Sequence, residues 1–245
     1  MAREVIVTAE KVKNRKRLWR IVKLSLCLLL LFMIVVYFIL QIIYNEGRFT
    51  ILLDSNKTLE SGIAIYDNLD DPRPRRRLEA DAVPFMDNIS WKWLPEDIDT
   101  RSDGSHNGEN FLAYSFYIEN QGNSILHYWY ELNLDLVTRN VDEAIRVMIF
   151  QNGERKIYAK PNSLSGEPEH IGTRDTELTI PFLADRGNTI ILEQRRDFNP
   201  GDRDRYTIVI WIEGDDPDCL DPLIGGVLRM YMKITEEHIQ RRGGE

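Results

Sequence analysis

The longest apolar stretch of the chain runs from Leu24 to Tyr44 and contains no charged residue. A helix of this length, rising about 1.5 Å per residue, crosses the roughly 30 Å hydrocarbon layer of a bilayer. A helix that is apolar on every side can also be buried inside a large protein. Because the remaining sequence predicts nothing that would surround such a helix, the pattern predicts a single transmembrane helix.

Basic residues precede this segment. The first 23 residues contain eight lysines and arginines, whereas the four residues that follow the segment, NEGR, contain one. Lysine and arginine close to a membrane span stay on the cytoplasmic side. The sequence therefore predicts a basic cytoplasmic tail at residues 1–23, a transmembrane helix at residues 24–44 and about 200 residues outside the cell.

A cleaved secretory signal is the main alternative to a retained anchor. The apolar region of such a signal is typically about 7–15 residues long and ends in a small-residue cleavage site. The segment here is longer and continues into QIIYNE, which does not resemble such a site. We therefore expect a signal-anchor in the cell membrane, with the bilayer as its partner.

Alternation of apolar and polar residues marks much of the chain after the anchor. In residues 111–120 (FLAYSFYIEN) and 126–137 (LHYWYELNLDLV), every second residue is apolar, which is typical of antiparallel strands with one buried face. The turn residues QGN between them predict that the two strands form a hairpin. The buried face of the second strand is predicted to continue to Leu136.

Two further segments carry specific signals. Asn152-Gly153 separates β-favouring residues 145–150 and 155–159, and it predicts a tight hairpin because both turn positions adopt positive φ. Residues 206–212 (YTIVIWI) are apolar at nearly every position and are predicted to form a central strand covered on both faces. The predicted core includes Leu112, Phe116, Leu132, Ile210 and Met230.

Residues 67–81 contain two prolines and many charges and predict a loop, whereas residues 89–94 (ISWKWL) alternate and predict a strand. Residues 227–234 form the last predicted strand. Nine or ten short strands separated by turns predict an all-β fold, an antiparallel β-sandwich of jelly-roll-like type. We assign residues 45–236 to this extracellular domain and residues 237–245 to a flexible C-terminal tail.

The formal net charge is -8 and the isoelectric point is about 5.2, although the N-terminal tail is basic. An acidic exterior argues against binding of nucleic acid. Of the two cysteines, Cys27 lies in the predicted membrane span, so Cys219 has no partner for a disulfide within the outer domain. The partners that we expect outside the cell are other surface or matrix proteins, or further copies of this chain.

The usual catalytic motifs are not found in the sequence. There is no G-x-S-x-G, Walker A or G-x-G-x-x-G motif, and no histidine has the spacing of a zinc site. We therefore expect no enzyme activity, catalytic residue or cofactor-binding residue. The four histidines are His106, His127, His170 and His238.

One acidic cluster follows the predicted central strand directly. Calcium takes six to eight oxygen ligands, so this cluster is the candidate metal site, although its spacing differs from that of an EF-hand loop. The alternative is that these residues shape and cap a turn. Carboxylates this close together repel one another, and Arg203 and Arg205 are candidates to offset that repulsion. The candidate ligands are Glu213, Asp215, Asp216, Asp218 and Asp221.

The segment from Tyr206 to Cys219 (YTIVIWIEGDDPDC), the Gly225-Gly226 pair and the closing strand resemble the C-terminal part of TasA/camelysin-like surface proteins of Gram-positive bacteria. The resemblance implies a jelly-roll-like β-sandwich outside the cell, and some family members assemble into biofilm matrix fibres. Camelysin is described as a metalloprotease, but no residue here matches a catalytic ligand of that protein by a motif. This chain also departs from the family, because its anchor is predicted to be retained.

These observations predict a single-pass, membrane-anchored cell-surface protein with a structural or interaction role at the cell envelope or in a biofilm matrix. One alternative is a camelysin-like, metal-dependent peptidase. The other alternative is a carbohydrate-binding module, which exposed tryptophans stacked on one face would favour. The tryptophans considered for such a face are Trp91, Trp93 and Trp129.

Overall fold

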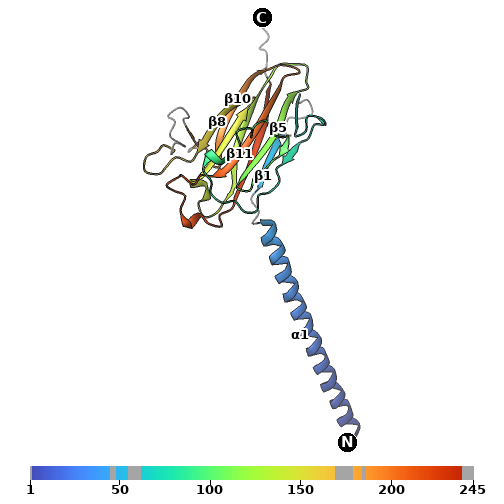
Figure 1. The fold of residues 1–245 in the computed structure, drawn as a ribbon. Helices are drawn as coiled ribbons and strands as arrows, with labels where there is room; N and C mark the ends of the chain where they lie inside the picture. Colours follow the sequence, from blue (N-terminus) through green and yellow to red (C-terminus); the bar gives the residue numbers. More distant parts are fainter. Residues whose placement is uncertain (1, 45–47, 55–61, 169–178, 184–185, 239–245) are drawn as a thin grey trace. The chain divides into compact units, whose positions relative to one another are not determined.

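The computed structural model divides into two compact units, residues 1–45 and residues 46–245 (Figure 1). The residues that it describes are 2–44, 48–54, 62–168, 179–183 and 186–238. The first unit is a helix, and the second consists mainly of strands.

Helix α1 (Ala2–Tyr44) is continuous, so the predicted tail at residues 1–23 is helical from Ala2 onward. Residues Arg17–Leu40 have a mean hydropathy of 2.7 in their most apolar part, and none of that part is buried. This helix is therefore long and apolar enough to cross a membrane, a property that membrane anchors and signal sequences share.

The second unit is a β-sandwich. Its five-stranded sheet has the order β10-β6-β12-β1-β3, with β1 parallel to β12 and the other pairs antiparallel. The strands of this sheet are β1 (Arg48–Leu53), β3 (Arg77–Glu79), β6 (Leu126–Val137), β10 (Thr189–Phe198) and β12 (Leu228–His238).

The other sheet has the order β2-β5-β11-β7-β8-β9, and β4 pairs with β5. Only β8 and β9 are parallel within it. Its strands are β2 (Ile63–Tyr66), β4 (Gly104–Ser105), β5 (Phe111–Asn120), β7 (Ile145–Gln151), β8 (Glu154–Ala159), β9 (Ile180–Pro181) and β11 (Arg203–Ile212). Short 3-10 turns are η2 (Trp91–Trp93), η3 (Val141–Glu143) and η4 (Asp221–Leu223).

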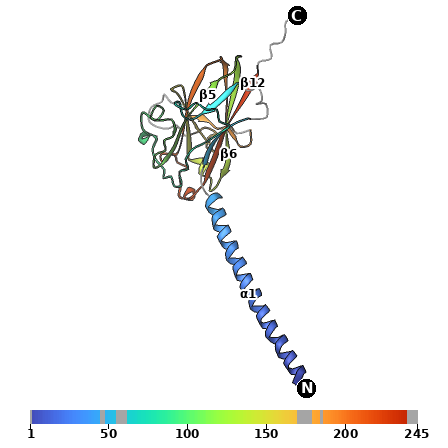
Figure 2. The ribbon, with the colours of Figure 1, turned by 90° about the vertical axis from the view of Figure 1, so that its right-hand side faces the viewer.

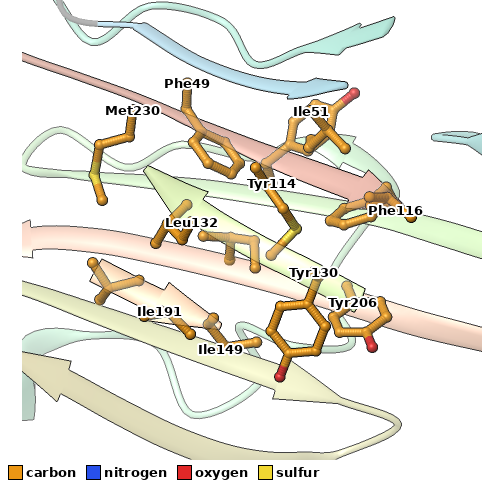
Figure 3. Close-up of a cluster of buried hydrophobic side chains, with 14 of the residues drawn as sticks. Phe49, Ile51, Tyr114, Phe116, Tyr130, Leu132, Ile149, Ile191, Tyr206 and Met230 are labelled. Atoms are coloured by element: carbon orange, nitrogen blue, oxygen red, sulfur yellow. The ribbon is translucent and has the colours of Figure 1, made fainter. Parts of the chain in front are cut away.

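The main core lies between the two sheets, which Figure 2 shows as separate layers with β6 and β12 in one and β5 in the other. Tyr206 of β11 stacks on Phe116 with ring centroids 5.5 Å apart and meets Tyr130 of the opposite sheet edge-on at 5.4 Å (Figure 3). All five predicted core residues are buried, with at most 6% of any of them exposed. The predicted buried face is thus confirmed, but the expectation that only one face of β5 is buried is wrong, because Phe111 and Ala113 on its other face are buried as well.

Strand β11 is covered on both faces, as its sequence predicts. Its inner face contributes to the main core, whereas Val209 and Trp211 on the outer face pack in a second cluster with Met148 of β7. Ile89 and Ile98, from the long connection between β3 and β4, close this cluster from outside. The seven-stranded sheet is therefore sandwiched between the other sheet and a covering segment, residues 89–98.

The hairpin predicted at Asn152-Gly153 is confirmed, because both residues have positive φ, 53° and 87°, and β7 pairs with β8. The hairpin predicted for β5 and β6 is wrong. These strands belong to different sheets, and the QGN turn carries the chain from one sheet to the other. The buried side chain of Asn120 holds this crossover: its amide donates to the carbonyl oxygens of Phe198 (2.8 Å) and Ser124 (3.0 Å).

The buried face of β6 does not continue to Leu136. The pairing of β6 with β12 shifts by one residue between Leu134 and Leu136, which marks a β-bulge. Beyond the bulge the side chains exchange faces, so Val137 packs on the main core in place of Leu136.

Three further boundaries differ from the predictions. The loop at residues 67–81 contains β3, whose Leu78 is buried against β1. Residues 89–94 form a single bridge from Ile89 to Glu213, followed by η2, and not a strand. Strand β12 continues to His238 because it pairs with β6 along its full length, so residues 237 and 238, which were predicted to belong to the tail, lie in this strand.

Candidate functional site

The acidic segment predicted to bind calcium connects β11 to η4. Hydrogen bonds fasten it to the covering segment, because Ile89 N–H donates to Ile212 O (2.9 Å) and Gly214 N–H donates to Ile89 O (3.0 Å). Its carboxylates differ in environment: Glu213 and Asp216 are buried, Asp218 is partly buried, and Asp215 and Asp221 are exposed.

Glu213 faces the interior, where three N–H groups donate to its carboxylate. The donors are the indole of Trp211 (3.0 Å), the backbone of Trp91 (3.2 Å) and the backbone of Asp215 (3.2 Å). A buried carboxylate requires such donors, since burying an unpaired charge costs several kcal/mol. Glu213 thus joins β11, its own loop and the covering segment.

Asp216 forms a buried ion pair with Arg146 of β7. The guanidinium Nη2 donates to Asp216 Oδ2 at 2.5 Å, and both side chains are at most 1% exposed. The other oxygen, Oδ1, accepts from Asp218 N–H (2.8 Å), which closes a turn of the loop. Asp216 therefore combines turn formation with charge neutralisation.

The carboxylates of Asp215 and Asp218 are directed to different elements. Asp215 accepts from the Ser90 hydroxyl (2.9 Å), and Asp218 accepts from the Asn162 amide (3.1 Å). Within the described part of the chain, no three His, Cys, Asp or Glu side chains come together in an arrangement that holds a metal ion. Calcium binding by this segment therefore stays a prediction, and the contacts of Asp215, Asp216 and Asp218 support the turn-forming interpretation.

Arg146 offsets the repulsion in this cluster, and the two arginines suggested by the sequence do not. Arg203 pairs with Glu119, and Arg205 lies beside Asp103. The sequence signal for Arg146 is faint, because it is one charge inside the apolar strand IRVMIF. Trp211 lies opposite Arg146 in the sheet, and both side chains are buried.

The surroundings of Cys219, His106 and His127 indicate structural roles for these side chains. Burial raises the pKa of the Cys219 thiol, and the carboxylates of Asp216 and Glu213 act in the same direction, so the reactive thiolate is disfavoured. The ring of His106 lies 3.0 Å from the carbonyl oxygens of Gly104 and Ile98. His127 accepts from Asp197 N–H. His170 and the side chain of His238 lie outside the described residues.

A polar cluster that the sequence analysis missed connects the two sheets. The Tyr128 hydroxyl of β6 donates to Asp204 Oδ2 of β11 (2.5 Å) and lies 2.9 Å from the Tyr206 hydroxyl. Asn152 and Arg195 also donate to Asp204, at 2.8 and 3.1 Å. Burial raises the pKa of both tyrosines, which therefore remain protonated donors.

Glu193 of β10 forms the second half of this cluster. It accepts from the hydroxyls of Tyr130 (3.0 Å) and Tyr158 (2.5 Å) and forms an ion pair with Lys156. Burial alone would raise the pKa of Glu193, but these hydrogen bonds outweigh burial and hold the pKa below its usual value. The signal in the sequence was a run of tyrosines on a predicted buried face, since buried tyrosine hydroxyls need partners.

The three tryptophans considered for sugar binding do not share one face. Trp129 lies on β6 and its indole donates to Glu237 of β12 (2.7 Å). Trp91 and Trp93 lie in η2, where Trp91 packs against the second cluster on the far side of the other sheet. The three tryptophans therefore do not form the common face that would favour the carbohydrate-binding alternative.

The five-stranded sheet carries a shallow hollow of about 200 Å³ on its outer face. Arg48, Arg77 and Arg229 line it together with Thr50, Asp135, Met230 and Tyr231. Glu79 lies 3.6 Å from Arg48 and 3.2 Å from Arg77. Three guanidinium groups thus surround this hollow with two nearby carboxylates, which favours an anionic ligand over a cation.

No family model and no curated protein matches the chain. Among solved structures, the chain is similar to the crystal structure of a beta-glucosidase from Kluyveromyces marxianus in complex with glucose. The identity is 13% and the TM-score is 0.26, over 79% of this chain and 18% of that chain. A likeness of this degree carries no argument about fold or function.

We predict that Asp216→Asn lowers the free energy of unfolding by about 3–5 kcal/mol, because it leaves the Arg146 charge buried without its partner. Asp221→Asn is the matched control. Its side chain is exposed, so the change should stay within about 0.5 kcal/mol. Urea unfolding of both variants measures the difference, and equal stabilities would show that the ion pair contributes little.

A second prediction concerns calcium. If the segment binds calcium in the folded state alone, calcium at about 100 times its dissociation constant adds roughly 2.7 kcal/mol and raises the melting temperature. Asp215→Asn combined with Asp221→Asn should abolish this rise. Both side chains are exposed, so the variant leaves the buried ion pair intact. Identical melting in EDTA and in millimolar calcium would leave these residues as turn formers.

A third prediction follows from Glu193, whose pKa is lower in the folded protein than the value of about 4.3 for unfolded glutamate. Its contribution to stability is present above that unfolded pKa and is lost as pH falls through the folded pKa. The stability difference between the wild type and Glu193→Gln should therefore shrink below about pH 4. Glu154→Gln, at an exposed position of β8, is the control, and a difference independent of pH would contradict the assignment.

Proposed function

We propose that the chain is a single-pass membrane protein that displays its β-sandwich outside the cell, with the N-terminus in the cytoplasm. The observation that carries this proposal is α1, which presents an uncharged, exposed apolar segment long enough to span a bilayer. A bilayer would cover this surface, and the alternative of a signal sequence differs only in whether the segment is later removed.

The distribution of charge supports the orientation. Eight basic side chains precede the apolar segment, and basic residues next to a span stay on the cytoplasmic side. Residues 46–245 carry 23 lysines and arginines against 37 aspartates and glutamates, which suits a soluble, displayed domain.

We propose a structural or interaction role at the cell envelope or in a biofilm matrix for the displayed domain. The β-sandwich is the architecture that the resemblance to TasA/camelysin-like surface proteins implies. Both faces of the central strand are covered, so the surfaces left for partners are loops, strand edges and the outer face of the five-stranded sheet. Contacts through such surfaces suit association with matrix proteins or with further copies of the chain.

Protease accessibility tests the proposal. On intact cells or protoplasts that express the chain with an N-terminal tag, added protease should remove the sandwich and leave a tagged fragment of the tail and span. In permeabilised cells the tag should be lost as well. An intact domain in the medium that begins near residue 45 would show that the segment is a cleaved signal, and a protected sandwich would overturn the orientation.

A further inference from the structure

The strand directions define two ends of the β-sandwich. At one end, Arg48 of β1 pairs with Arg229 of β12, next to Leu228 and Val137. The short connection through η3 leads from Val137 to β7, whose Ile145 pairs with the last residue of β11. We call this end, where β1, β7 and β12 begin, the anchor end.

The opposite end is where β1, β5, β10 and β12 finish and where β6 and β11 begin. Ile125 lies there, next to the first residue of β6.

The most exposed apolar side chains of the described sandwich residues lie at the anchor end. Leu220 and Ile224 flank η4 in the connection from β11 to β12. Leu164 lies in the loop that Asn162 fastens to Asp218. Leu164 is 96% exposed, Ile224 67% and Leu220 59%. Two further residues of this end are similarly exposed, Trp93 at 72% and Phe85 at 70%.

Phe85 and Trp93 belong to the same end. Trp93 lies in η2, which the Glu213 carboxylate holds beside the end of β11. The segment that contains Phe85 is held at both sides. Before it, Ala80 N–H donates to Phe49 O near the start of β1. After it, Asp87 N–H donates to the side chain of Asn110, just before β5. Other exposed large apolar side chains of the described sandwich are at most 46% exposed.

Strongly exposed apolar side chains that lie at the same end of a domain are typical of a protein or membrane interaction site. The covalent chain favours the membrane. Arg48, the first residue of β1, follows Tyr44, the last residue of α1, by only four residues, so the covalent chain joins this end of the sandwich directly to the anchor. Tryptophan and phenylalanine are also residues of interfacial contact.

The arginines of this end fit the headgroup layer. Arg48 and Arg229, at the start of β1 and of β12, line the hollow. The guanidinium of Arg139 donates to Ile224 O (2.8 Å). Guanidinium groups recognise phosphate, which every phospholipid headgroup carries. Asp215 and Asp221 on the same loops would oppose an anionic surface, so the chemistry fits a zwitterionic phospholipid.

We propose that the anchor end of the sandwich contacts the phospholipid bilayer, with Leu220 and Ile224 in the interfacial layer and the arginine-lined hollow beside headgroup phosphates. This inference rests on the proposed anchoring by α1. It adds that the domain is fastened to the membrane surface and does not move freely above it.

Fluorescence quenching by spin-labelled lipid tests the contact in the full chain, reconstituted into phosphatidylcholine nanodiscs. In a background of Cys27→Ser and Cys219→Ser, an environment-sensitive dye is attached to Ile224→Cys, to Ile125→Cys or to Tyr37→Cys. Ile125 is the matched control, an exposed isoleucine at the opposite end, and Tyr37 lies within the apolar segment.

The expected result is strong quenching and a blue-shifted emission at positions 37 and 224, with neither at position 125. Quenching at 37 without quenching at 224 overturns the contact and leaves the anchoring intact, whereas no quenching at 37 overturns the anchoring itself. Equal quenching at 224 and 125 overturns a contact specific to the anchor end. The dye at Leu164→Cys repeats the measurement at a 96% exposed position, where the substitution spares the core.

Discussion

The apolar outer face of β11 and its neighbours has to be removed from water, and this constraint organises one side of the molecule. Trp211 and Val209 are fully buried there, which the opposite sheet cannot achieve because it covers the other face. The connection from β3 to β5 supplies the cover. Polar contacts fix its path, among them Arg205 Nη2 donating to Ser102 O (3.0 Å). Apolar burial thus supplies the driving force, and the hydrogen bonds fix the register.

Burial next to Trp211 also explains the acidic segment. Glu213 and Arg146, which neighbour Trp211, are buried as well, and each needs an internal partner. A row of carboxylates that looks like a ligand set is therefore distributed among an indole, an arginine, a serine and an asparagine on four different elements. Carboxylates shared out in this way hold loops together.

The sequence predicted the features that local pattern determines. Alternation identified the residues of β5, β6 and β12 that face the main core, apart from Leu136, but it did not predict that the other face of β5 is buried too. Asn152-Gly153 identified its hairpin, since positive φ at both positions suits few residues. Pairing between distant segments was harder. The QGN turn between β5 and β6 carries the same turn residues whether it closes a hairpin or passes between sheets. The bulge before Leu136 likewise depends on β12, about 90 residues later.

The candidate site shows the same difference between features that local sequence determines and features that depend on distant residues. The position of the five carboxylates was evident from the sequence, whereas their directions depend on Arg146 and Ser90, which lie far away in the chain. The tyrosine cluster around Asp204 and Glu193 joins four strands, so no single window of sequence contains it.

The parallel pairing of β1 with β12 bears on how the protein is made. Among the described strands, β1 is the first after the helix and β12 the last, so this pair in the five-stranded sheet forms only after the roughly 180 residues from Arg48 to Leu228 have been synthesised. Pairings at such sequence separation are slow to form. A ribosome that feeds this chain into a membrane would therefore deliver an open, unpaired sheet, and closure of the sandwich would await the final strand.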